Sequence, residues 1–173
     1  SRVMKEKYEK EKLIYTSTTD ELTRCLNRHA YEEDLNRLDP AEEWIYISMD
    51  INGLKCVNDS LGHAAGDELI CAAADCMKEC FQNYGNVYRI GGDEFVVYLS
   101  NVTDRQNAMA VAEKLCQVIR ELSTMKKEWS NISASIGISF ADHPNIKMEE
   151  LYISADKAMY SAKENGRNQY QTL

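Results

Sequence analysis

The spacing of apolar and polar residues changes period several times along the chain of 173 residues. Apolar residues that recur every three to four positions predict amphipathic helices over 28–38, 64–81, 104–123 and 148–161. Apolar or alternating runs predict strands over 44–49, 87–90, 95–99 and 132–140, with an edge strand over 170–173. Strands separated by helices, with one hairpin among them, predict an α/β chain with a mixed sheet that carries helices on its faces.

Two segments depart from this alternation. Residues 1–16 combine paired Lys and Glu with scattered apolar residues, which favours a solvent-exposed helix. Residues 16–20 are Thr, Ser, Thr, Thr and Asp, which prefer caps and turns, so we expect the helix to break there. The first helix is either a bare surface helix or a connector from an upstream domain. Asn27 is the expected N-cap of the next helix.

The segment 51–67 is rich in Asn, Asp, Gly and Lys, and we interpret it as a loop. Leu54, Val57 and Leu61 are interleaved with these polar residues, and a purely connecting loop rarely keeps so much apolar anchoring. Loops that pack onto a scaffold while offering polar groups are where binding sites are commonly built. We therefore expect this segment to contribute to a site.

Composition narrows the class of protein. The net charge of −8 offers no general basic surface for nucleic acid or an anionic membrane. The sequence contains no run of about 18 apolar residues, so we expect no membrane contact by this segment. The first residue is Ser, so we expect a domain of a longer protein, which could itself be membrane-anchored. The six cysteines include no C-x-x-C pair, and we expect them to be free thiols that pack as small apolar side chains, which fits a cytoplasmic protein.

Charged residues gather at three element ends. Asp50 ends a buried strand, Asp93 and Glu94 follow two glycines at the tip of the predicted hairpin, and Lys163 and Arg167 stand near the end of the last helix. If the Asp50 strand lies beside the hairpin, the carboxylates converge, and such groups repel unless a cation sits between them. Oxygen ligands of this kind suit Mg²⁺ that also binds phosphates, so the pattern indicates nucleoside triphosphate chemistry. The alternative is that these charged residues lie independently of one another on the surface.

The sequence resembles the GGDEF family of diguanylate cyclases. Its signature is Gly91-Gly92-Asp93-Glu94-Phe95. Three further segments resemble the family in the same order and spacing, and together the likeness covers about residues 20–170: Asp20-Glu21-Leu22-Thr23 with Leu26-Asn27-Arg28, Asp50 to Asp67, and Lys163-Glu164-Asn165-Gly166-Arg167-Asn168. The resemblance implies a central mixed, mainly antiparallel five-stranded sheet flanked by helices, akin to the nucleotidyl cyclase and polymerase palm fold. It also implies a helical linker over 1–18 and a catalytic domain over 19–173.

The resemblance further implies a bacterial signalling enzyme that condenses two GTP molecules into cyclic di-GMP and two pyrophosphates. By this likeness, Mg²⁺, with Mn²⁺ as an alternative, would be bound by Asp50, the Ile51 carbonyl, Asp93 and Glu94. Asp50, Asp93 and Glu94 would be the catalytic residues. Lys55, Lys163 and Arg167 would hold phosphates, while Asn58 and Asp67 would read guanine. Ionised Asp is acceptor-only and so matches the two adjacent donors of guanine. Because one domain holds one GTP, turnover would need a homodimer, which an upstream sensor domain would bring together.

Several positions depart from the family pattern. Asn52 replaces an Asp that many relatives carry; it is not the position that the resemblance assigns to the metal, so we expect activity to survive this change. Leu54 replaces an aromatic residue; we expect it to keep the apolar anchor and to alter the packing under the nucleotide. Gln82 and Gly85 stand where many members have the Arg and Asp of a feedback site, which predicts weak product inhibition. Arg89 either contacts a ligand phosphate or braces the hairpin. The alternative to an enzyme is a catalytically silent module that binds GTP or a partner and regulates a neighbouring domain.

Overall fold

The computed structural model describes residues 1–39, 41–100, 105–141 and 145–172. The expected helix start at Asp104 and strand end at Leu173 lie outside these residues. The elements along the chain are α1 (Arg2–Thr18), α2 (Arg28–Arg37), β1 (Trp44–Asn52), α3 (Leu54–Leu61), α4 (His63–Phe81), β2 (Val87–Arg89), β3 (Glu94–Ser100), α5 (Arg105–Ser123), a 3₁₀ turn (Lys127–Trp129), β4 (Ser133–Phe140), α6 (Met148–Glu164) and β5 (Gln169–Thr172).

Five strands of the described chain form one sheet in the order β2-β3-β1-β4-β5. The pairs β2–β3, β3–β1 and β1–β4 are antiparallel, whereas β4–β5 is parallel. The expected mixed, mainly antiparallel sheet flanked by helices is therefore confirmed. In this register Asp50 at the end of β1 lies directly opposite Glu94 of β3 and Ser135 of β4.

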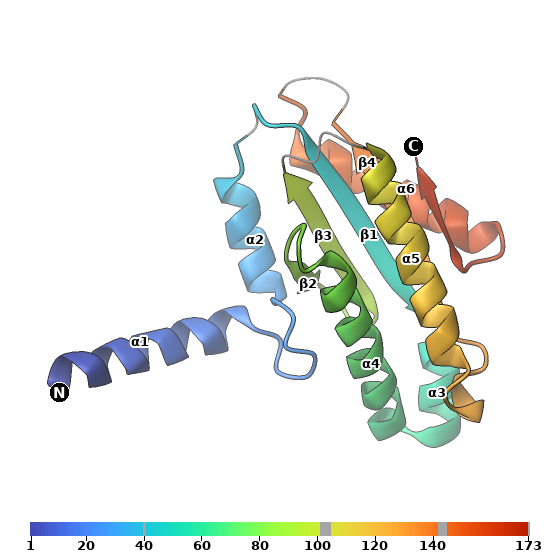
Figure 1. The fold of residues 1–173 in the computed structure, drawn as a ribbon, viewed down its shortest axis with the longest axis horizontal. Helices are drawn as coiled ribbons and strands as arrows, with labels where there is room; N and C mark the ends of the chain where they lie inside the picture. The colour runs from blue at the N-terminus through green and yellow to red at the C-terminus, as the bar shows by residue number, and fades with distance from the viewer. Residues whose placement is uncertain (40, 101–104, 142–144, 173) are drawn as a thin grey trace.

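Helices cover both faces of the sheet (Figure 1). Alternate residues of β1 point into two cores, because successive side chains of a strand face opposite sides. Ile47 and Met49 join the core under α4 and α5, to which Cys116 also belongs, whereas Tyr46 joins the core under α2 and α6. All nine residues of β1 are buried, which explains its nearly continuous apolar run.

The backbone of the helix α6 passes very close to the sheet at Gly137 of β4. A Cβ atom on Gly137 would lie 1.9 Å from the carbonyl oxygen of Ala155 and 2.3 Å from the amide nitrogen of Met159. Only a residue without a side chain lets the backbones of helix and strand meet at this distance. This contact sets the height of α6 above the sheet, and Lys163 follows Met159 by about one helical turn.

The helix α1 ends at Thr18, within the expected break at residues 16–20. The hydroxyls of Thr16 and Thr18 donate to the carbonyls of Lys12 and Ile14, so these side chains satisfy carbonyls in the last turns of the helix. No residue of α1 is buried, and the helix projects away from the rest of the chain (Figure 1).

The helix α3 corrects the expectation that 51–67 is a loop. Gly53 and Gly62, both at φ 91°, bound the helix, and the second of them separates it from α4. Leu54, Val57 and Leu61 have helical spacing, and Val57 is buried. The high content of polar residues concealed a helix short enough to fit between two glycines in the left-handed region.

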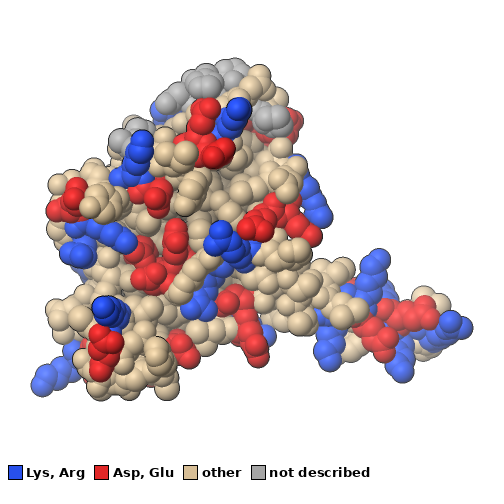
Figure 2. Space-filling view, turned by 180° about the vertical axis from the view of Figure 1, so that it is seen from behind, with Lys and Arg blue, Asp and Glu red and all other residues tan. Residues whose placement is uncertain are grey.

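The face seen in Figure 2 carries acidic and basic side chains side by side. The projecting helix α1 likewise carries both signs along its length (Figure 2). Among the described residues, none of the helices combines the length and apolar character that crossing a bilayer requires.

Candidate active site

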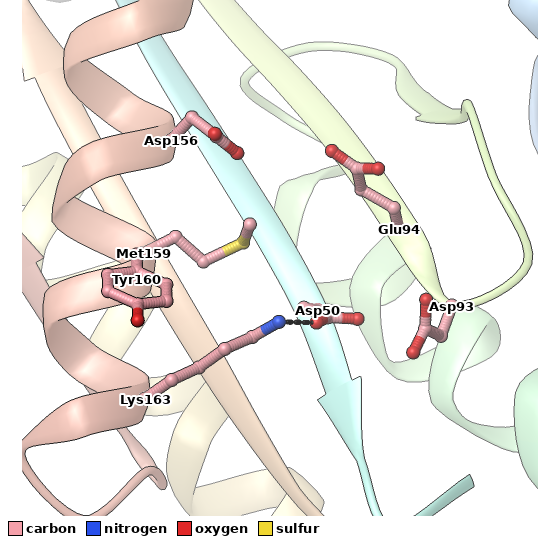
Figure 3. Close-up of a pocket in the computed structure, with 7 residues that line it drawn as sticks. All are labelled: Asp50, Asp93, Glu94, Asp156, Met159, Tyr160 and Lys163. Carbon is pink, nitrogen blue, oxygen red and sulfur yellow. Dashed lines mark ion pairs between the residues drawn. The ribbon is translucent and has the colours of Figure 1, made fainter. Parts of the chain in front are cut away.

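A pocket of about 450 Å³ opens between α6, the end of β1 and the glycine hairpin (Figure 3). Four of its residues come from one side of α6, and the others come from the sheet and the hairpin. Its lining residues are Asp50, Asp93, Glu94, Asp156, Met159, Tyr160 and Lys163. Four carboxylates therefore share this pocket with one lysine.

Asp50 lies on the floor of the pocket and is only 7% exposed. Its Oδ2 atom forms an ion pair with Nζ of Lys163, which reaches across the pocket from α6 (Figure 3). Its Oδ1 atom is buried and has no hydrogen-bond partner among the described residues. The pKa of Asp50 is raised to about 6, with burial as the largest cause; the charge of nearby Asp93 contributes to this rise, and the Lys163 pair acts in the opposite direction. One oxygen of this carboxylate is thus available to a ligand.

The hairpin is fastened to β1 and closed on itself by backbone hydrogen bonds. The amide of Ile51 donates to the Asp93 carbonyl at 3.2 Å, and the amide of Ile90 donates to the Glu94 carbonyl at 3.0 Å. Because N–H and C=O of one strand residue point to the same side, the Ile51 carbonyl also faces the hairpin. Asp93, which is partly exposed, is therefore held beside the end of β1 by its own backbone.

Arg89 braces the hairpin from below. Its Nε and Nη2 atoms donate to the Gly92 carbonyl at 3.1 and 2.8 Å, and its Nη1 atom donates to Asp20 at 3.1 Å. Of the two roles considered for Arg89, the structure shows the bracing one.

Glu94 faces Asp156 across the pocket (Figure 3). Burial raises the pKa of Glu94, and the charges of Asp156 and Asp93 raise it further. Sequence reasoning did not single out Asp156 or Tyr160. Their spacing of seven and three residues before Lys163 places them on the same helix face, and this signal was readable in the sequence.

The donor set at Asp50 suits a hard divalent cation. A buried unpartnered carboxylate oxygen, a neighbouring carboxylate on Asp93 and the Ile51 carbonyl offer oxygen ligands of the type that Mg²⁺ prefers. In the described ranges no three Asp, Glu, His or Cys side chains converge as a complete metal cage, since Glu94 points towards Asp156 instead. Mg²⁺ commonly takes one or two carboxylates and completes its shell with water and phosphate, so these residues fit the ion.

The other candidate residues lie outside the lining of this pocket. Lys55 and Asn58 are on α3, and Asp67 is on the neighbouring helix α4. The Asn58 amide occupies the space above Gly66, where a Cβ atom would lie 1.7 Å from Asn58 Oδ1. Gly66 therefore lets the Asn58 side chain pack against the turn of α4 that carries Asp67.

Lys163 and Arg167 both lie near the end of α6, as expected, but only Lys163 is within the helix. The helix α6 ends at Glu164, and the chain then turns through Gly166 at φ 108° and Arg167 at φ 62°. Lys163 points into the pocket, whereas Arg167 is exposed beyond the turn. Gly166 redirects the chain after the helix, so helical spacing does not apply between Lys163 and Arg167.

The departures from the family pattern have local explanations. The Asn52 amide nitrogen donates to the hydroxyls of Ser133 and Ser135, both at 2.9 Å, which is a role for an amide donor that an ionised Asp lacks. A Cβ atom at Gly85 would lie 2.9 Å from the Tyr98 carbonyl oxygen, so any side chain there would force a shift.

Comparison with known proteins identifies the family to which this chain belongs. The family model described as "Diguanylate cyclase, GGDEF domain" matches residues 17–169. The chain therefore belongs to the GGDEF family. The structure of the coiled coil and GGDEF domain of DgcB from Caulobacter crescentus, in complex with c-di-GMP, has the same fold, with a TM-score of 0.87 at 22% identity over 99% of this chain and 94% of that one.

Two relatives are more similar in sequence. Diguanylate cyclase A of Treponema denticola is 36% identical over 167 residues, which cover 90% of this chain and 44% of that protein. The active GGEEF domain of a diguanylate cyclase from Vibrio cholerae is 30% identical, with a TM-score of 0.68, over 83% of this chain and 88% of that one. The chain thus spans less than half of the Treponema protein. Both of these relatives are diguanylate cyclases.

Proposed function

We propose that this chain is the catalytic domain of a diguanylate cyclase. In the proposed reaction, the 3′-hydroxyl of each GTP attacks the α-phosphorus of the other, forms a phosphodiester bond, loses its proton to water and releases pyrophosphate. The observation that carries the proposal is the pocket in which Asp50 and Asp93 meet Lys163 at the signature hairpin of a GGDEF chain.

The proposed metal ligands are Asp50, the Ile51 carbonyl and Asp93, with Glu94 as a further ligand or a proton-handling residue. Bound Mg²⁺ or Mn²⁺ would supply charge neutralisation of the triphosphate and polarisation of the α-phosphate. Asp50 offers its unpartnered Oδ1 atom for this role, and Asp93 is presented by a hairpin that backbone bonds hold against β1.

The proposed substrate contacts divide into two groups. Lys163 brings an ammonium group to the floor of the pocket, where it can stabilise phosphate charge, and Lys55 and Arg167 supply cations from two exposed positions. Asn58 and Asp67 are proposed to bind guanine, and the packing of Asn58 over Gly66 supports their acting together.

The direct test is incubation of the protein with GTP and Mg²⁺ at high concentration, followed by nucleotide analysis. We expect cyclic di-GMP and two pyrophosphates per product molecule. If no cyclic dinucleotide forms even when two copies are joined through a dimerising fusion, the silent regulatory module becomes the better description of the chain.

Turnover is expected to depend on dimerisation, because one pocket presents one GTP and the attacking hydroxyl must come from another copy. Specific activity should therefore rise with protein concentration until the dimer is saturated. A dimerising fusion upstream of α1 should remove this concentration dependence, while a monomeric fusion partner of similar size should preserve it. Specific activity that stays constant down to concentrations where sedimentation shows only monomer would contradict the prediction.

Weak product inhibition is expected because Gln82 and Gly85 replace the charged pair of the family's feedback site. Initial rates measured with added cyclic di-GMP should fall less than about twofold at product concentrations that equal the substrate. A Gln82→Arg variant should not restore strong inhibition, since Gly85 has no room for the second charged side chain beside the Tyr98 carbonyl. Tight inhibition of the unmodified chain would reveal a different feedback site.

We also propose that α1 over 1–18 links this domain, over 19–173, to an upstream sensor domain in a cytoplasmic setting. An exposed helix that carries both charges and six large apolar residues supports a connecting role: Val3, Met4, Tyr8, Leu13, Ile14 and Tyr15.

A further inference from the structure

The segment from Asp20 to Leu26, here called the junction loop, connects α1 to the catalytic hairpin. Leu26 forms a parallel bridge with Tyr88, its amide donates to the Val87 carbonyl at 3.0 Å, and its carbonyl accepts from the Arg89 amide at 2.8 Å. The loop therefore extends the sheet at the outer edge of β2, which is the strand that leads into the glycine hairpin.

Asp20 is the hub of the junction loop. Its Oδ2 atom accepts from the Thr23 amide at 2.9 Å, from the Thr23 hydroxyl at 2.6 Å and from Arg89 Nη1 at 3.1 Å. The side chains of Asp20 and Arg89 are 23% and 17% exposed, so water screens this ion pair less than a surface pair. Thr23 fixes the carboxylate, and the carboxylate in turn fixes the guanidinium.

Arg89 passes this constraint to the hairpin. Its Nε and Nη2 atoms grip the Gly92 carbonyl as a fork, which restrains the direction of the carbonyl as well as its distance. The carbonyl of Gly92 belongs to the peptide unit that includes the Asp93 amide, so its orientation sets the start of the Asp93 backbone. Gly91 and Gly92 are exposed and lack side chains, so little packing restrains this turn.

We propose that Asp20 and Arg89 are positioning residues that hold the Asp93 carboxylate in the pocket through the Gly92 carbonyl. This inference rests on the proposed function for its catalytic consequence, while its structural content concerns the hairpin alone. Neither side chain lines the pocket at Asp50, so neither acts on the substrate there. They restrict the hairpin to the conformation in which Asp93 meets Asp50.

The junction loop has a second anchor, which supplies a matched control. Lys78 of α4 donates to the Thr23 carbonyl at 2.7 Å and pairs with Asp75 at 3.3 Å, with no tie to the hairpin. Lys78→Met loosens the same loop from its other side. If Asp20 and Arg89 only stabilise the loop, Lys78→Met should have the same effect on activity as substitutions of Asp20 and Arg89. If they position Asp93, only the substitutions of Asp20 and Arg89 should reduce activity.

The test compares Asp20→Asn, Arg89→Lys and Lys78→Met in the full chain. Asn keeps an acceptor for Thr23 but loses the charge, and Lys keeps the charge but loses the fork. Asp20→Asn and Arg89→Lys are here called the hairpin variants. For both we expect kcat to fall about tenfold while KM for GTP stays within about twofold of its value in the unmodified chain, because misplacement of a reacting group affects the transition state more than ground-state binding. Hydrogen exchange of the amides over 90–94 should quicken about tenfold in both variants, and the double variant should be no worse than either single one. Lys78→Met should match the unmodified chain in both measurements.

Each outcome decides the proposal. Unchanged kcat and unchanged exchange in the hairpin variants would overturn it, as would equal losses in all three variants or a loss confined to KM. If the unmodified chain makes no cyclic di-GMP even as a forced dimer, the proposed function fails, and the exchange measurement alone then decides whether Asp20 and Arg89 hold the hairpin. Melting temperatures identify any variant that fails to fold. If Asp20→Asn is unfolded, Asp20→Glu is measured in its place.

Discussion

Asp93→Asn is expected to reduce turnover of GTP by about 1000-fold or more while the chain remains folded. The amide is nearly the same size as the carboxylate, but it removes the charge that balances a divalent cation beside Asp50. Losses of this order are typical when an electrostatic group of a transition state is removed. The backbone of the hairpin should survive, because the Asp93 carbonyl, rather than its side chain, accepts from Ile51.

The measurement is the initial rate of cyclic di-GMP formation together with Mn²⁺ binding in the presence of a non-hydrolysable GTP analogue. Asp93→Asn should weaken ion binding as well as turnover. Asp75→Asn is the matched control, because Asp75 is an exposed carboxylate on α4 whose ion pair in the described part of the chain is with Lys78, away from the pocket. Retention of more than about a tenth of the activity by Asp93→Asn would remove this residue from the proposed chemistry.

Gly137→Ala is expected to lower the free energy of unfolding by about 3 kcal/mol, near the upper end of overpacking costs. The added Cβ atom would lie 1.9 Å from the Ala155 carbonyl oxygen, so the backbone of α6 must move away from β4. For a chain of this length the loss corresponds to a fall in Tm of about 6–12 °C. Activity should fall too, because the displaced helix carries Lys163 away from Asp50.

Gly92→Ala is the control for the stability measurement. It makes the same chemical change at a glycine whose added Cβ atom would meet nothing within 4 Å. Urea unfolding of both variants should therefore separate the close approach of α6 from the general effect of replacing glycine. Equal midpoints for Gly137→Ala and the unmodified chain would show that α6 can shift without cost.

The fold was readable from the sequence wherever one period dominated a segment. The apolar run of β1, the alternation in β4 and the helical spacing in α4 and α5 all predicted elements that the structure contains. The prediction failed at α3, where polar residues are as numerous as apolar ones and two glycines bound eight residues. The end of α1 at Thr18, in contrast, falls within the expected break at residues 16–20.

The candidate site was only partly readable. The expectation that Asp50 would lie beside the hairpin required only that two strands be neighbours, and the register places Asp50 opposite Glu94. The pair between Lys163 and Asp50 depends on the height of α6 above β4, which Gly137 sets through a contact between distant segments. Asp156 and Tyr160 entered the pocket for the same reason.

The sequence by itself determined the family, the mixed sheet and the identity of the charged groups, because motifs and periodicity are local properties of the chain. Only the tertiary structure decided which charges meet. It paired Lys163 with Asp50, turned the chain between Lys163 and Arg167, and committed Arg89 to the Gly92 carbonyl and Asp20. These outcomes depend on backbone approaches and turn conformations between remote segments, and a one-dimensional spacing of residue types does not contain them.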